Sequence, residues 1–80
     1  MNDLTRRVHT LIQAELGTPA ERIAPHTRIA ELGDSLDWLG LLSAVEAEFG
    51  IELDETQESR LVTVADLVRL LEERPALAPS

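Results

Sequence analysis

The stretch ELGDSLDWLGLLSAVEAEFG, residues 31–50, decides the fold of this chain. From its sixth residue onward, apolar side chains recur every three or four positions, which is the spacing of one face of an α-helix. These residues are Leu36, Leu39, Leu42, Val45 and Phe49. The pattern predicts a helix from about Ser35 to Phe49 that ends at Gly50.

Ser35 opens this helix, directly after a segment rich in proline and glycine. The free backbone N–H groups and the positive end of the helix dipole favour a phosphate attached at such a position. The same place suits an ordinary helix start, with Asp34 as the cap and Asp37 supporting the first turn. Position alone leaves both interpretations open.

A first helix is predicted upstream, capped by Asn2 or Asp3 and stopped by Gly17. Its apolar stripe consists of Leu4, Val8, Leu11, Ile12 and Leu16. Residues 18–33 then form a connection longer than most links between packed helices. Three apolar residues are spaced so that they can fix this connection onto the core, namely Ile23, Ile29 and Leu32.

Downstream, residues 54–60 are polar and are expected to hold one irregular helical turn. Thr63 and Asp66 then predict the start of a last helix, as a short version of a capping box. The apolar face of that helix consists of Val64, Leu67, Val68 and Leu71, and Pro75 forbids its continuation. The fold class is therefore an all-α bundle of three longer helices and one short helix. We expect residues 1–74 to form the domain and residues 75–80 a flexible tail or linker remnant.

Composition narrows the functional classes. The chain has 80 residues, of which 44% are hydrophobic, and its only aromatic side chains are Trp38 and Phe49. It contains no cysteine, which excludes disulfides, a thiolate nucleophile and a cysteine-based zinc site. The start lacks a secretion signal, and no stretch has membrane-spanning length. We expect a cytoplasmic protein.

The net charge of −8 is concentrated in one part of the chain. Between Arg28 and Arg60 there are nine acidic residues and no Lys or Arg. Such a field repels nucleic acid and anionic membranes and attracts basic protein surfaces. The acids surround Ser35 and its helix, so we expect a docking face there rather than only a solubilising surface.

The tetrapeptide Gly33-Asp34-Ser35-Leu36 is also the signature of an esterase and lipase family. That chemistry needs a histidine aligned on the serine, together with oxyanion donors on a rigid α/β scaffold. Both histidines, His9 and His26, precede the serine, and the chain is too short for such a fold. We therefore reject hydrolysis. We also expect both histidines to lie on the surface and no metal to be bound.

Over nearly its whole length the chain resembles the acyl carrier proteins. The match consists of Leu32-Gly33 before Asp34-Ser35-Leu36-Asp37, the acidic end of the following helix at Glu46, Glu48, Phe49 and Gly50, and the start of the last helix at Thr63, Val64 and Asp66. The resemblance implies a carrier rather than an enzyme. Ser35 would bear 4′-phosphopantetheine, derived from coenzyme A, whose thiol holds acyl groups as thioesters.

The resemblance also implies the partners. A phosphopantetheinyl transferase would attach the arm, and acyl-loading, ketosynthase-type or acyltransferase enzymes with basic or apolar docking surfaces would use it. Nucleic acid and membrane are not expected partners, and the protein is expected to be a monomer. The residues expected to meet partner enzymes are Asp34, Leu36, Asp37, Trp38, Glu46 and Glu48.

Departures from the family pattern favour a specialised, polyketide-like pathway over bulk fatty-acid synthesis. The segment before Ser35 is shorter than in the fatty-acid type, and Gly40 stands where the family usually has a docking glutamate. The outward stripe of the helix is nearly uncharged and consists of Leu36, Gly40, Ser43 and Ala47. Trp38 is expected either to cover the edge of the bundle or to lie beside the arm. An aminoacyl or peptidyl carrier, and an acidic helical interaction module without cargo, remain alternatives.

Overall fold

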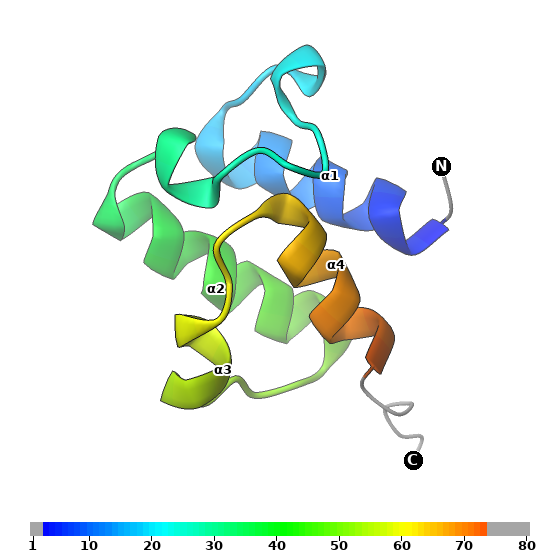
Figure 1. Ribbon diagram of the computed structural model, residues 1–80, viewed down its shortest axis with the longest axis vertical. Helices are drawn as coiled ribbons and strands as arrows, with labels where there is room; N and C mark the ends of the chain where they lie inside the picture. The colour runs from blue at the N-terminus through cyan, green and yellow to red at the C-terminus, as the bar shows by residue number, and fades with distance from the viewer. Residues whose placement is uncertain (1–2, 74–80) are drawn as a thin grey trace.

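The computed structural model describes residues 3–73 as helices joined by loops (Figure 1). Along the chain these are α1 (Asp3–Leu16), the 3-10 turns η1 (Ala20–Arg22) and η2 (Ile29–Glu31), α2 (Ser35–Phe49), α3 (Glu55–Ser59) and α4 (Val64–Glu73). The predicted all-α bundle of three longer helices and one short helix is confirmed. Asn2 and the expected tail at 75–80 lie outside the described residues.

The core lies between α1, α2 and α4 and is built from aliphatic side chains. Each of these helices contributes two side chains with almost no exposure, namely Val8, Ile12, Leu41, Val45, Val64 and Leu67. Burying one such side chain contributes about 1.5–3 kcal/mol. The core therefore forms without an aromatic centre, because Phe49 and Trp38 are only partly buried and pack against its edge.

The buried face of α2 matches the face that the sequence predicted at Leu42 and Val45 but not at the start of the helix. Leu36 and Leu39 are 77% and 56% exposed, whereas Leu41, Leu42 and Val45 are buried. Apolar residues occur around most of this helix, so the three-to-four spacing fits more than one face. Packing against α1 and η2 selects the face that contains Leu41.

Two helices end at glycines in the left-handed conformation, as the sequence predicted. Gly17 has φ of 66° and Gly50 has φ of 65°. In each case the glycine N–H donates to a carbonyl of the last turn, Gln13 O for Gly17 and Glu46 O for Gly50. Glycine adopts this conformation without the steric cost that a Cβ atom brings.

Reciprocal caps begin both C-terminal helices. At α4, Asp66 Oδ2 accepts from the backbone N–H groups of Thr63 and Val62 at 2.9 and 3.0 Å, and Thr63 Oγ1 accepts from Asp66 N–H. The N–H donors of Thr63 and Val62 hold the pKa of Asp66 below its ordinary value. At α3, Asp54 and Gln57 make the same reciprocal bonds at 2.8 and 3.0 Å. The α4 cap was predicted from the sequence, whereas the cap at Asp54 was not.

The 18–33 connection is fixed to the start of α4 by three backbone hydrogen bonds. Ile29 N–H donates to Val62 O (2.9 Å), Val64 N–H to Thr27 O (3.0 Å) and Ala65 N–H to Pro25 O (2.8 Å). An isolated antiparallel bridge pairs Arg28 with Thr63 in the same place. Ile23 and Ile29 are buried and Leu32 is partly buried, so the predicted anchoring of the connection is confirmed.

The expectation that both histidines lie on the surface is wrong for His9. His26 is exposed, but His9 is only 8% exposed. His9 follows the fully buried Val8 on α1 and lines a hollow together with Val64, Ala65 and Val68 of α4. The buried face of α1 is thus wider than its apolar stripe, because α4 also covers the polar residue His9.

Candidate functional site

Ser35 is the first residue of α2, and its side chain is exposed. Its hydroxyl forms no hydrogen bond with any other part of residues 3–73. The backbone N–H groups of the first helical turn lack partners within the helix, so they create a positive potential beside this hydroxyl. The geometry suits an oxygen that is esterified to a phosphate, because the ester would meet these groups without rearrangement.

A reciprocal cap holds the start of α2 in place. Asp37 N–H donates to Asp34 Oδ1 at 3.0 Å, and Asp34 N–H donates to Asp37 Oδ2 at 3.1 Å. Both predicted roles, Asp34 as cap and Asp37 as support of the first turn, are confirmed. The cap uses one oxygen of each carboxylate, so the other oxygen takes no part in it.

Gly33 allows this cap to close. A Cβ atom built on Gly33 would lie 2.6 Å from Asp37 Oδ2 and 2.8 Å from Asp37 Cβ, both too close for real atoms. The second distance involves the root of the Asp37 side chain, so a change in the position of the carboxylate alone would not relieve the clash. Glycine is required here because of this close approach rather than because of an unusual φ.

We expect Gly33→Ala to lower the free energy of unfolding by about 1–2 kcal/mol, since the Asp34–Asp37 cap would open. Urea denaturation measures this loss. Gly40→Ala is the matched control, because the nearest atom to a Cβ there, Glu15 Oε1, is 3.6 Å away. Equal stability of Gly33→Ala and wild type would contradict the assigned role of Gly33.

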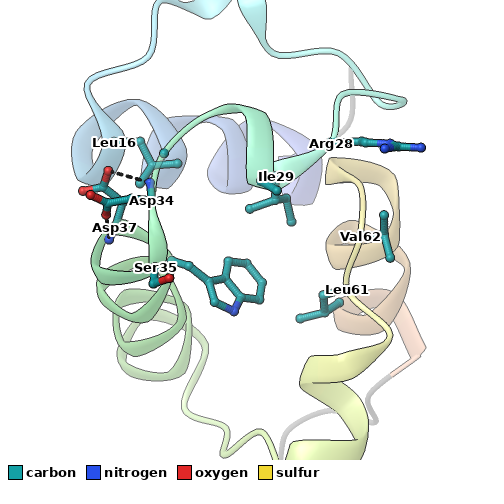
Figure 2. A pocket seen from close by; sticks show the side chains of 11 residues that line it. Leu16, Arg28, Ile29, Asp34, Ser35, Asp37, Leu61 and Val62 are labelled. Carbon is teal, nitrogen blue, oxygen red and sulfur yellow. Dashed lines mark hydrogen bonds between the residues drawn. The ribbon is translucent and has the colours of Figure 1, made fainter.

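A groove of about 560 Å³ lies beside Ser35. Figure 2 shows Asp34, Ser35 and Asp37 along one side of it, Leu61 and Val62 along the opposite side, and Ile29 between them. The remaining lining residues are Leu16, Arg28, Ala30, Gly33 and Trp38. The groove is mostly apolar and no histidine lines it, so the histidine base of a Ser-His hydrolase is missing from it.

Trp38 combines the two expectations stated for it. The side chain is partly buried against the core, as a residue covering the bundle edge would be. It also lines the groove next to Ser35. The single indole of the chain is thus placed to contact anything that extends from Ser35 along this groove.

Glu46 and Glu48, which were predicted to meet partners, both have partners within the chain. Glu46 Oε2 accepts from the backbone N–H of Leu53 at 2.8 Å and so ties the loop after α2 to the helix. Glu48 Oε2 lies 2.9 Å from Arg7 Nη2 of α1. The Arg7 guanidinium also lies 4.5 Å from the centre of the Phe49 ring. A partner protein would therefore compete with these contacts for either carboxylate.

The outward face of α2 is apolar near Ser35. Ser43 and Ala47 are exposed, as predicted, and Leu36, which the sequence placed in both the apolar and the outward stripe, is exposed too; Gly40 is only partly exposed. The side of Gly40 on which a Cβ would stand faces the carboxylate of Glu15 from α1. Sequence reasoning missed this contact because it joins residues on two different helices.

Two negative findings concern the described residues. Within residues 3–73, no group of three or more His, Cys, Asp or Glu side chains is arranged to hold a metal ion. In the same range, no helix is both long and apolar enough to cross a membrane.

Comparisons with known proteins agree with this geometry. Residues 6–71 match the family described as "Phosphopantetheine attachment site". The chain belongs to the acyl carrier protein family. Two curated relatives are an acyl carrier protein of Sinorhizobium fredii (strain NBRC 101917 / NGR234) and the acyl carrier protein AcpP of Rhizobium meliloti (strain 1021). Each is 36% identical over 78 residues, which cover 95% of this chain and 100% of the relative.

A solved structure supports the same assignment. The solution structure of MacpD, an acyl carrier protein from Pseudomonas fluorescens involved in mupirocin biosynthesis, has a TM-score of 0.75 and 30% sequence identity to this chain. The likeness covers 96% of this acyl carrier protein and 75% of MacpD. The protein is thus a phosphopantetheine-bearing acyl carrier, and members of its family act as carriers rather than catalysts.

Proposed function

We propose that Ser35 is the residue that bears the 4′-phosphopantetheine and that the protein delivers acyl groups from this arm to partner enzymes without catalysing a reaction itself. The observation that carries the proposal is the exposed, unpaired hydroxyl of Ser35 at the N-terminus of α2. The bound group supplies a thiol that holds the acyl cargo. This chain supplies a rigid, capped helix start, and its small size lets the tethered cargo reach one active site after another.

A phosphopantetheinyl transferase would activate Ser35, since no histidine lines the groove. In that reaction the serine oxygen would bond to the pantetheine-side phosphorus of coenzyme A, its proton would pass to a base of the transferase, and adenosine 3′,5′-bisphosphate would leave. The N-terminus of α2 would favour the resulting phosphodiester, and Ile29, Leu61 and Val62 would supply an apolar wall for the arm.

The test is to incubate the protein with coenzyme A, Mg²⁺ and a promiscuous phosphopantetheinyl transferase and to weigh the intact product. We expect a mass gain of one phosphopantetheine, located by peptide mapping to the fragment that contains Ser35. An unchanged mass, under conditions that load a control carrier fully, would favour an interaction module of the same fold that carries no cargo.

We further propose that partner enzymes recognise the start of α2. Asp34 and Asp37 line the groove with Ser35 and Trp38, and Leu36 is 77% exposed. Glu46 and Glu48 mark the far end of the same helix. A partner surface that combines apolar side chains with a few basic ones fits this arrangement.

The nearly uncharged centre of α2 suggests a specialised pathway, in keeping with the mupirocin carrier among the similar structures. A general fatty-acid ketosynthase should therefore use this carrier poorly. We expect Gly40→Glu to raise turnover with such an enzyme several-fold, because it adds a charge at the helix centre. Gly40→Gln is the control that adds length without charge. Steady-state rates with the loaded variants measure the effect, and an unchanged rate would count against docking through this position.

The remaining expectations follow from the same proposal. Residues 1–74 would form the working domain, and we infer a monomer that meets its partners one at a time. Because its maturation consumes coenzyme A, we place its action in the cytoplasm.

A further inference from the structure

His9 stands out among the titratable groups because it is buried and lacks a partner. Its side chain is on α1, the residue is 8% exposed, and Nε2 finds no hydrogen-bond partner among residues 3–73. An imidazole that is buried without such a partner loses hydration in its neutral form and loses much more when protonated. The proposed carrier chemistry makes no use of it.

The hollow that His9 lines has two charged side chains in its wall, and both come from α4. The hollow has a volume of about 220 Å³. Arg69 and Glu72 line it from α4, Thr5 from α1 itself, and Pro25 from the 18–33 connection. Arg69 pairs with Asp66 at 3.1 Å. Burial lowers the pKa of His9 below the ordinary value of 6.5.

His9 also lies at the junction that builds the groove beside Ser35. It lines the hollow together with Pro25, Val64 and Ala65, and the Ala65 N–H to Pro25 O bond joins two of these residues. Two further hydrogen bonds, from Val64 N–H to Thr27 O and from Ile29 N–H to Val62 O, continue this seam between the 18–33 connection and the start of α4. The second of them joins Ile29 directly to Val62. Those two residues belong to the groove wall that Figure 2 shows opposite and above Ser35.

We propose that protonation of His9 opens the junction between α1, the 18–33 connection and α4, and thereby loosens the groove wall beside Ser35. The closed state holds His9 neutral, and the open state lets water reach the imidazole. Since the open state binds one proton more, acidification shifts the population towards it. The contribution of neutral His9 to closure is complete above the ordinary pKa of 6.5 and is lost as the pH falls below it. This regulation goes beyond the carrier role and does not require Ser35 to be modified.

The test is hydrogen exchange of three backbone amides, followed by NMR on the unmodified protein. These amides are Ile29, Val64 and Ala65, which donate the bonds of the seam. After correction for intrinsic exchange, we expect the opening constants of these three amides to rise by up to about tenfold between pH 7.5 and pH 5.5. This is the limit for one proton taken up on opening by a histidine with the ordinary pKa of 6.5. The amide of Trp38, which donates to Asp34 O within α2, serves as the internal reference and should stay constant.

Two variants assign the effect. His9→Gln should abolish the rise, because glutamine does not titrate, whereas His26→Gln, at an exposed histidine, should retain it. A ring titration of His9 in the wild type keeps the test decisive if His9→Gln does not fold, since the pKa of His9 must then lie below the ordinary value of 6.5. Constant opening in the wild type, an equal rise in His9→Gln, or an ordinary His9 titration would each overturn the proposal. Because the protein is unmodified, none of these results depends on whether Ser35 accepts the arm.

Discussion

Ser35→Ala is expected to abolish the uptake of phosphopantetheine completely. The variant removes the one oxygen that the proposal requires and leaves the Asp34–Asp37 cap in place, because that cap uses no atom of the Ser35 side chain. Alanine also suits the first turn of a helix. The loss should thus appear as unchanged intact mass after incubation with coenzyme A and transferase, while circular dichroism and urea denaturation match the wild type.

The chain provides matched controls for this result. Ser43 is an exposed serine in the middle of the same helix, so Ser43→Ala should load fully. Ser59 lies at the end of α3, where its hydroxyl donates to Thr56 O at 2.8 Å, and Ser59→Ala should also load. If Ser35→Ala still gained the mass of one arm, or if Ser43→Ala lost it, the assigned attachment site would be wrong.

The local features of this fold could be predicted from the sequence. The two left-handed glycines, the Thr63–Asp66 cap and the start of α2 at Ser35 each depend on residues within four positions of one another. Capping and turn chemistry act over such distances, so the residue types alone indicate the conformation. The candidate site shares this property, since Asp34, Ser35 and Asp37 all lie within residues 34–37.

The features that the sequence did not reveal depend on contacts between distant segments. The groove beside Ser35 needs the 18–33 connection to pair with the start of α4. The ion pair of Glu48 with Arg7 joins α2 to α1, and Glu15 of α1 lies close to the position that a Cβ atom of Gly40 would take. His9 is buried because α4 covers it, although imidazole is polar. No periodic pattern encodes which helix lies opposite another, so these outcomes had to come from the packing.

The buried face of α2 is the strongest case of this kind, and a pair of variants tests it. Leu41 has no exposed surface, and we expect Leu41→Ala to lower the free energy of unfolding by about 2–5 kcal/mol through lost burial and the cavity left behind. Leu39 is 56% exposed, and Leu39→Ala should cost no more than about 0.5 kcal/mol. Both changes remove the same atoms from the same helix, so helix propensity cancels in the comparison.

Urea denaturation followed by circular dichroism measures both losses on one scale. A small domain has a total stability near the lower end of about 5–15 kcal/mol, so Leu41→Ala should leave the protein partly unfolded at room temperature. If the two variants lost equal stability, or if Leu39→Ala lost more, the burial of Leu41 and the exposure of Leu39 described above would be wrong. Ser35 would then point in a different direction relative to the groove, because residues on one helix turn together. The stability of two leucine variants therefore also tests the orientation of the proposed attachment site.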